Sequence, residues 1–211
     1  MKRFLIIFLA LAVIAGLCIG AYYVFFYEAP QEYPNPTAVI TLSDGSRLNL
    51  ELYPKIAPNT VANFVELAQA GFYNGSEIYR VVPGVLILTG DPIGDGTGGA
   101  GYYIRGEFDK NGFSNSISHV RGTVSMARQT GYNTGSSQFF ILQGSYPQYD
   151  GQYAAFGALT DEESLYVLDQ IASRPIDGSY RPLTRIFIQS IQVETYGAEY
   201  HAVKIEQGGK K

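Results

Sequence analysis

A glycine-rich segment, Gly94-x-Gly96-x-x-Gly99, is the first candidate for a chemical site. Its spacing occurs in loops that bind the pyrophosphate of a dinucleotide, and such loops lead directly into a helix. Here the β-like run 102–104 follows instead, and Asp95 lies inside the motif. We therefore expect a surface loop and no nucleotide cofactor.

Other residues with common catalytic or metal-binding chemistry are few. Asp91 and Asp95 could supply oxygen ligands to calcium, but no supporting acidic spacing follows them. The histidines, His119 and His201, occur without a Gly-x-Ser-x-Gly pattern, which argues against a serine hydrolase. The single cysteine, Cys18, lies in an apolar run, so the rest of the chain can form neither a disulfide nor a thiolate metal site. We expect no metal and no cofactor.

A series of short segments through the middle of the chain carries a more specific signal. The segments are Asn63-Phe64-Val65, Gly71-Phe72-Tyr73, Tyr79-Arg80-Val81-Val82-Pro83-Gly84, Gly90-Asp91-Pro92, Gly96-Thr97-Gly98-Gly99, Glu107-Phe108, Arg121-Gly122-Thr123-Val124-Ser125-Met126-Ala127, Ser137-Gln138-Phe139-Phe140 and Phe156-Gly157. Their order and spacing resemble the cyclophilin family over about residues 37–195. One segment alone would be a weak indication, whereas the ordered set is highly specific.

The resemblance implies a fold and an activity. The fold is mainly β, a closed eight-stranded antiparallel β-barrel capped by two α-helices. The activity is peptidyl-prolyl cis-trans isomerisation of proline-containing segments bound in a groove on the outer face of the barrel. The task is rotation about an X-Pro bond, whose barrier is about 18–20 kcal/mol because the C–N bond is partly double. Rotation requires no covalent intermediate, metal or cofactor.

The resemblance also assigns roles to residues. Arg80 matches an arginine whose guanidinium donates to the proline ring nitrogen as that nitrogen pyramidalises. Gln138 matches a residue that holds the substrate backbone, and Phe140 matches the floor of the proline pocket. Taken singly, each has a more common structural role for its type: an exposed strand charge for Arg80, a solvent-facing polar residue for Gln138 and a core residue for Phe140. The substrate-binding residues implied at other positions are Val85, Leu86, Leu88, Gly96, Met126, Ala127, Arg128, Gln148, Tyr149 and Tyr153.

Some of these positions depart from the family pattern. Val85 and Leu86 stand where the family usually has an aromatic residue and a methionine. Leu88 stands where a glutamine usually steadies the arginine, so Arg80 loses a hydrogen-bond partner and the rate is expected to fall.

The far wall of the groove also departs from the family pattern. Gln148 and Tyr149 replace a tryptophan- or leucine-type wall, and Tyr153 replaces a frequent histidine. The pocket is expected to be wider and more aliphatic on one side. Two functions therefore stay open: a prolyl isomerase, and a catalytically weak or inactive module that binds proline-containing segments of envelope partners. A purely structural barrel is a third, with less in its favour.

The apolar pattern predicts the elements that position these residues. Strands are expected at residues 38–42, 47–53, 78–82, 85–89, 123–127, 138–142, 154–159 and 184–194. Helical spacing predicts helices at 58–70 and 160–173, the second with Thr160 and Glu163 as a capping box. The last strand changes phase between Ile188 and Ile191, which predicts a β-bulge near Gln189 and Ser190.

The N-terminal region is expected to lie outside this domain. Residues 4–26 are uncharged and apolar, long enough to cross a hydrocarbon core of about 30 Å. Lys2 and Arg3 before them predict a cytoplasmic N-terminus. We expect a cytoplasmic stub and signal-anchor at 1–27, a proline-rich linker at 28–36, the domain at 37–195 and a flexible tail at 196–211. A cleaved signal peptide is the rival, but bulky residues prolong the apolar run beyond its usual length.

Charge and localisation complete these expectations. The chain has 19 acidic and 15 basic residues, a net charge of −4, and no basic stripe, so a nucleic-acid partner is not expected. The leading hypothesis is a monomeric, single-pass membrane protein, of bacterial type, that isomerises X-Pro bonds of exported proteins and assists their folding. Its partners would be proline-containing polypeptides, and the membrane through residues 4–26.

Overall fold

The computed structural model describes residues 15–16 and 32–206. Residues 15 and 16 are helical, and the rest of the predicted membrane segment, 4–26, lies outside the described residues. None of the described helices is both long and apolar enough to span a bilayer. The domain that follows belongs to the unit Pro34–Lys211.

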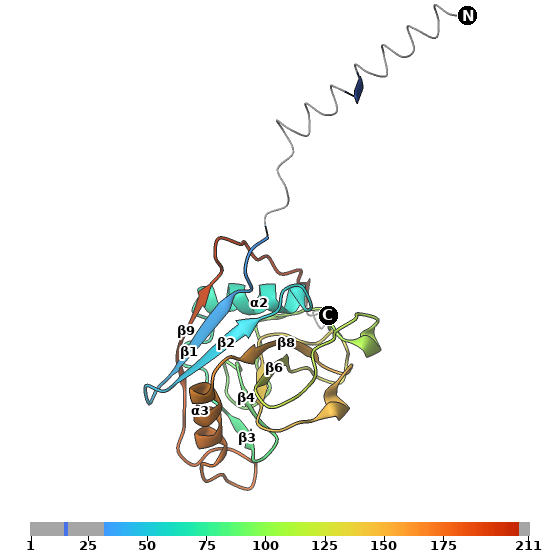
Figure 1. Cartoon of the computed structure of the whole chain (residues 1–211). Coiled ribbons are helices and arrows are strands. Elements are labelled where there is room, and N and C mark those ends of the chain that lie inside the picture. The colour runs from blue at the N-terminus through green and yellow to red at the C-terminus, as the bar shows by residue number, and fades with distance from the viewer. Residues whose placement is uncertain (1–14, 17–31, 207–211) are drawn as a thin grey trace, which may run out of the picture. The chain divides into compact units, whose positions relative to one another are not determined.

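The domain is built on a strongly curled antiparallel sheet (Figure 1). Its strands are β1 (Thr37–Leu42), β2 (Arg47–Leu52), β3 (Arg80–Val82), β4 (Leu86–Thr89), β6 (Thr123–Met126), β7 (Phe139–Leu142), β8 (Ala154–Leu159) and β9 (Ile188–Glu194). They are ordered β3-β4-β7-β6-β8-β2-β1-β9. Each coincides with one of the eight predicted strands. A second, two-stranded sheet pairs β5 (Tyr102–Tyr103) with β10 (Ile205–Glu206).

The main sheet does not close into a barrel, so that part of the predicted fold is wrong. Within the described part of the chain, β3 and β9 are its two edges. The segments that precede them meet through an isolated bridge between Glu77 and Phe187 and a hydrogen bond from Ile78 N to Ile186 O. The Gly75 N–H also donates to the Ile188 carbonyl, and the Ile188 N–H donates to the Ser76 carbonyl, each at 2.8 Å. Among the described residues these contacts involve the segment before β3, and β3 itself does not pair with β9. The result is a curled half-barrel.

The predicted bulge in the last strand is confirmed. Thr41 of β1 pairs with Ser190, and Leu42 pairs with Ile188, so Gln189 is the extra residue. The bulge turns both Ile188 and Ile191 to the interior, where each is buried.

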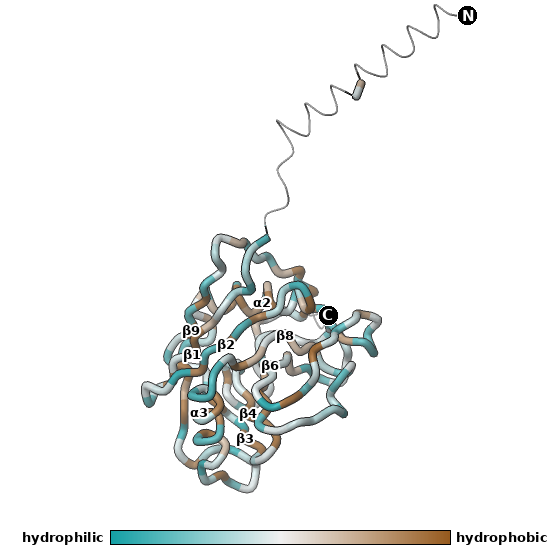
Figure 2. Tube along the Cα trace, in the orientation of Figure 1, coloured by the Kyte–Doolittle hydropathy of each residue, from teal (hydrophilic) through white to brown (hydrophobic). Residues whose placement is uncertain are grey.

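Two helices cover opposite openings of the curled sheet, α2 (Pro58–Gln69) above and α3 (Glu162–Ala172) below in Figure 1. Phe64 of α2 enters the interior, where its ring centroid lies 5.4 Å from those of Tyr73, Phe139 and Phe156. These rings are among the largest fully buried side chains and form the centre of the core. Figure 2 shows apolar and polar stretches alternating along the strands and helices, as one-sided burial requires.

The first turn of α2 is capped by a residue distant in sequence. The helix follows Ala57, whose side chain cannot accept a hydrogen bond. The buried carboxylate of Glu107 instead accepts from the backbone N–H of Asn59 at 3.0 Å and of Thr60 at 2.8 Å. It also accepts from the Thr60 hydroxyl at 2.7 Å. A negative charge at a helix N-terminus also interacts favourably with the helix dipole.

The cap of α3 differs from the predicted capping box. Asp161, in extended conformation, accepts from the backbone N–H of Ser164 at 2.7 Å. Its other oxygen accepts from the Asn49 side chain at 2.9 Å, which ties the helix to β2. Thr160 instead hydrogen-bonds the Asn49 carbonyl and the Asp161 carboxylate. The helix starts one residue later than a Thr160 cap would place it, because an aspartate oxygen outcompetes the threonine hydroxyl for the first N–H groups.

Residues 197–206, part of the tail predicted to be flexible, are bound to the domain. Asn59 exchanges two hydrogen bonds with the backbone of Val203, at 2.7 and 3.1 Å. Glu66 of α2 accepts from the Ala202 N–H at 3.1 Å and pairs with Lys204 at 2.9 Å. Besides these polar contacts to α2, Tyr200 packs against the main core.

Replacing Glu107 by glutamine should lower the free energy of unfolding by roughly 1–3 kcal/mol. The amide would turn N–H groups toward the backbone donors of Asn59 and Thr60, and the negative charge would be lost. Urea unfolding followed by circular dichroism measures the change. Glu163→Gln is the matched control, since Glu163 lies in the first turn of α3 and Asp161 supplies that cap. Equal effects of the two variants would contradict the capping role of Glu107.

Candidate active site

One row of side chains crosses three neighbouring strands on the outer face of the sheet. Arg80 of β3 pairs with Leu88 of β4, which in turn pairs with Phe140 of β7. Side chains two residues apart share a face, so Leu86 lies beside Leu88 and Leu142 beside Phe140. The register therefore places a guanidinium at the edge of an apolar surface.

The alternate residues of the same strands face the interior. Val81, Ile87 and Ile141 are paired across the strands and buried in the main core. The outer apolar residues form a separate cluster centred on Leu86 and Phe140. Each of the three strands thus bears apolar side chains on both faces. The inner set packs in the main core, and the outer set lies at the surface cavity.

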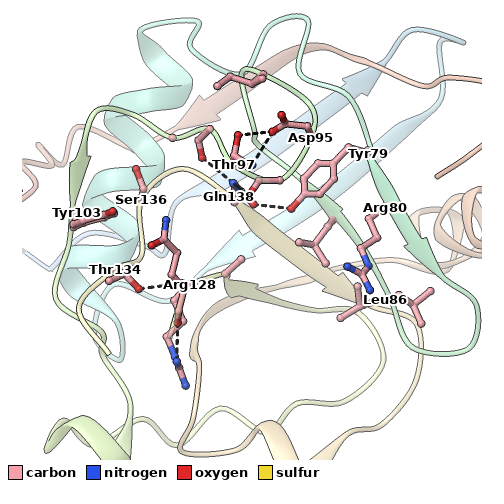
Figure 3. A pocket seen from close by; sticks show the side chains of 18 of the residues that line it. Tyr79, Arg80, Leu86, Asp95, Thr97, Tyr103, Arg128, Thr134, Ser136 and Gln138 are labelled. Carbon is pink, nitrogen blue, oxygen red and sulfur yellow. Dashed lines mark hydrogen bonds between the residues drawn. The ribbon is translucent and has the colours of Figure 1, made fainter. Parts of the chain in front are cut away.

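The cavity beside the row has a volume of about 950 Å³. Of the residues predicted from sequence to form the site, those that line it are Arg80, Val85, Leu86, Leu88, Gly96, Ala127, Arg128, Gln138 and Tyr149. They come from β3, β4, the loop before β5 and the segments around β6 and β7. Figure 3 shows Arg80 and Leu86 on one side of the cavity, Gln138 with Tyr79 above, and Arg128 below.

Four predicted site residues lie outside the lining. Phe140 is 3 % exposed and packs beside Leu86 and Leu88 in the outer apolar cluster. Tyr153 packs behind it, with ring centroids 5.5 Å apart. Met126 lies in the main core, because strand alternation turns it inward. Gln148 is exposed on the 3-10 helix η2 (Pro147–Tyr149), and its carbonyl accepts from the Gln152 side chain.

Arg80 keeps its donors free. Its side chain is exposed, and among residues 32–206 the guanidinium makes no hydrogen bond or ion pair. The residue directly across the ladder, Leu88, has no polar atom to offer it. A guanidinium carries five N–H donors and stays charged, so it is available to a ligand in the cavity.

Gln138 uses both amide N–H groups and one lone pair of its amide oxygen within the protein. Its amide oxygen accepts from the Tyr79 hydroxyl at 2.6 Å, and its amide nitrogen donates to the carbonyls of Gly96 at 3.1 Å and Gly98 at 2.7 Å. Burial, with Asp91 nearby, raises the pKa of Tyr79 well above its usual range, so the phenol remains a donor. Tyr79 was missed from sequence, because strand alternation predicts that it faces away from Arg80.

The loop that carries Gly96 and Gly98 is organised by a buried carboxylate. Asp91 is 1 % exposed and accepts from the backbone N–H groups of Ile93, Asp95 and Gly96. A Cβ at Gly98 would lie 2.0 Å from its Oδ1, so only glycine fits there. The glycine-rich segment is thus a wall of the cavity, and the strand β5 follows it, as the sequence indicated. Asp91 uses its oxygens within the protein.

The comparisons with known proteins agree with this geometry. Residues 37–193 match the family described as cyclophilin type peptidyl-prolyl cis-trans isomerase/CLD. The chain belongs to the cyclophilin family of peptidyl-prolyl cis-trans isomerases. It is 45 % identical over 132 residues to a peptidyl-prolyl cis-trans isomerase of Synechococcus elongatus, which covers 63 % of this chain and 86 % of that protein. It is 42 % identical over 146 residues to one of Helicobacter pylori, covering 69 % and 86 %.

A solved cyclophilin has the same fold. The crystal structure of a Cryptosporidium parvum cyclophilin type isomerase in the presence of the dipeptide Ala-Pro matches with a TM-score of 0.67 and 33 % sequence identity. The match covers 75 % of this chain and 98 % of that one. The additional residues of this chain lie mainly before the cyclophilin domain and after β9.

One end of the cyclophilin groove is closed by the side chain of Arg128. Its guanidinium carbon lies 5.3, 5.2 and 4.9 Å from the ring centroids of Phe108, Tyr132 and Tyr153. Its Nε donates to the Gln152 carbonyl at 3.1 Å. The resemblance implied that Arg128 binds substrate, and the structure adds a packed side chain that ties the loop after β6 to the segment before β8.

A histidine supports the floor of the groove from behind. The His119 ring stacks on Phe140 at 6.2 Å, and its nitrogens lie 2.9 Å from Asp150 Oδ1 and 3.0 Å from Ser125 Oγ. Burial lowers the pKa of His119, and the Asp150 carboxylate opposes this only in part. The folded protein therefore favours the neutral ring.

The pKa shift of His119 predicts lower stability in mild acid. The unfolded chain takes up a proton on this histidine as the pH falls below about 6.5, whereas the folded chain resists until a lower pH. The free energy of unfolding should therefore fall as the pH drops below about 6.5. His119→Gln should flatten this slope in urea unfolding at a series of pH values. His201→Gln, which removes an exposed histidine outside the groove, serves as the control. A slope that survives in His119→Gln would contradict the assignment.

Proposed function

We propose that this cyclophilin isomerises X-Pro bonds of exported proteins, with Arg80 as the catalytic donor. The observation that carries the proposal is the register Arg80–Leu88–Phe140, which places a guanidinium with free donors at the edge of an apolar pocket. The Cryptosporidium relative, solved in the presence of Ala-Pro, supports a proline-containing ligand for this groove.

The pocket would stabilise the twisted geometry through which the X-Pro bond passes during rotation. The proline ring would rest on the apolar residues Val85, Leu86 and Leu88, which line the cavity and pack in one cluster with Phe140. As the bond twists, the ring nitrogen loses its resonance with the carbonyl and gains a lone pair. A guanidinium N–H of Arg80 donates to that lone pair only in the twisted state. The interaction is therefore stronger in the transition state than in the ground state, as catalysis requires.

Substrate backbone would bind along the wall that Gln138 supports. Both N–H donors of its amide are in use, and its oxygen already accepts from Tyr79. A substrate carbonyl that accepts from the Gln138 amide nitrogen must therefore replace one of these contacts, for example that with Gly96, the longest at 3.1 Å. Such an exchange yields less net binding than a free N–H would. The amide oxygen has a second lone pair, which remains available to a substrate N–H.

A weakly catalytic binding module is the second candidate, and two observations favour it. Leu88 leaves Arg80 without a polar neighbour across the ladder. Both amide N–H groups of Gln138 donate within the protein. Both would reduce turnover more than they reduce binding of a proline-containing segment.

The proposed site of action is outside the cytoplasm, with the chain anchored through residues 4–26. What supports this is the uncharged apolar run after Lys2 and Arg3, followed by the proline-rich linker at 28–36. Assistance to the folding of exported proteins follows from that location, since slow X-Pro isomerisation limits their folding.

Arg80→Ala in the full chain should lower kcat/KM for an X-Pro peptide about a hundredfold or more. The variant loses the donor to the ring nitrogen, and the exposed position predicts an intact fold. A protease-coupled isomerisation assay with a short X-Pro peptide measures the rate. Arg47→Ala is the matched control, because Arg47 is an exposed arginine on β2 that lies outside the cavity lining. No acceleration by a folded wild type that still binds the peptide would favour the binding module.

The proposed location outside the cytoplasm can be tested by protease accessibility. The chain would be expressed in a bacterium, and protease would be added to intact spheroplasts. The domain should be digested from outside, whereas a cytoplasmic control protein should survive. Replacing Lys2 and Arg3 by glutamate should weaken this orientation. Full protection of the domain until the membrane is lysed would contradict the proposed location.

A further inference from the structure

We infer that Tyr180 is a positioning residue for Arg80, taking the place of the hydrogen-bonding partner that Leu88 does not provide. The inference rests on the proposed role of Arg80. Tyr180 belongs to the turn 177–181 that precedes β9, about a hundred residues beyond Arg80 in the sequence. It lies within the region that matches the family but in none of the short motifs that indicated it.

The contact is between a charge and the face of an aromatic ring. The guanidinium carbon of Arg80 lies 5.5 Å from the ring centroid of Tyr180. Within the described chain this is the only polar or cation–π contact of the Arg80 side chain. The contact therefore restricts the guanidinium from one side, while the cavity lies on another.

The backbone holds Tyr180 beside β3. The Val81 N–H donates to the Tyr180 carbonyl at 2.8 Å, so the residue after Arg80 is bonded directly to Tyr180. The Tyr180 N–H donates to the Asp177 carbonyl at 3.1 Å. Its φ is +66°, a left-handed conformation that a tyrosine rarely adopts. Such a conformation persists only where the surrounding structure requires it.

The turn that carries Tyr180 is fastened on both sides. The Asp177 carboxylate accepts from the backbone N–H groups of Ser179 at 2.8 Å and Arg181 at 3.0 Å. The Arg181 guanidinium pairs with the buried carboxylate of Glu77 at 2.7 Å and donates to the Gly94 carbonyl at 2.6 Å. The turn is thus tied to the segment before β3 and to the glycine-rich wall of the cavity. Tyr180 is held in a fixed position relative to the groove.

A ring is suited to this task, because it orients a guanidinium without consuming its donors. A glutamine would accept one N–H of Arg80, whereas an aromatic face attracts the cation through its π electrons. All five N–H groups of Arg80 stay available to the substrate. The groove can therefore be aliphatic at Leu88 and still present an oriented arginine.

The test compares three variants of the full chain in the isomerisation assay. Tyr180→Gly removes the ring and should lower kcat about two- to fivefold with little change in KM, the effect of one exposed cation–π contact. Tyr180→Phe keeps the ring and should retain the wild-type rate. Tyr196→Gly is the matched control, since Tyr196 also has a positive φ, of 55°, and bonds to Thr37 instead of Arg80.

The unfolding temperature distinguishes a positioning role of Tyr180 from a purely structural one. Glycine adopts φ +66° without strain, so Tyr180→Gly should unfold at a temperature no lower than that of Tyr196→Gly. In an Arg80→Ala background, Tyr180→Gly should cause no further loss of kcat. Three outcomes would overturn this inference and leave the proposed function standing. They are an equal loss of kcat in both backgrounds, a full wild-type rate in Tyr180→Gly, and a Tyr180→Phe variant as slow as Tyr180→Gly. An unchanged rate in Arg80→Ala would overturn the proposed function and this inference together.

Discussion

The site depends on the two-residue period of three short strands, β3, β4 and β7. Because successive side chains alternate between faces, each strand contributes one residue to the core for each residue at the cavity. Ile87 and Ile141 stabilise the domain from inside, while Leu88 and Phe140 form the apolar outer surface in register with Arg80. A slip of one residue in either ladder would exchange the two sets and remove the site together with part of the core.

Buried carboxylates then hold the parts that the strands do not reach. Asp91 organises the glycine-rich wall, Glu107 caps α2, and Glu77 binds Arg181 of the turn that carries Tyr180. Each is at most 5 % exposed. Burial of a charge is costly unless several donors compensate, and here backbone N–H groups or a guanidinium do so. The same bonds that offset burial also determine where the loops around the groove lie.

The arginine lies at an edge of the sheet, and this location has a consequence for its orientation. β3 has a regular ladder on one side only, toward β4, where Leu88 offers no hydrogen bond. Its other side receives the turn 177–181 through the bond from Val81 N to the Tyr180 carbonyl. An edge strand exposes backbone groups that must find partners, so this docking satisfies a donor and brings an aromatic ring to the guanidinium at the same time.

Much of this protein could be predicted from its sequence, because the deciding signals are local. Apolar alternation located the eight strands and the bulge at Gln189, helical spacing located α2 and α3, and the ordered motifs indicated the family. Tertiary structure alone decided the features that join distant residues. These are the open edge between β3 and β9, the Glu107 cap, the docking of residues 197–206, and the contact of Tyr180 with Arg80. A periodic pattern records which face of an element is buried, whereas a hydrogen bond or ring contact between segments depends on how those elements are arranged in space, which no local pattern contains.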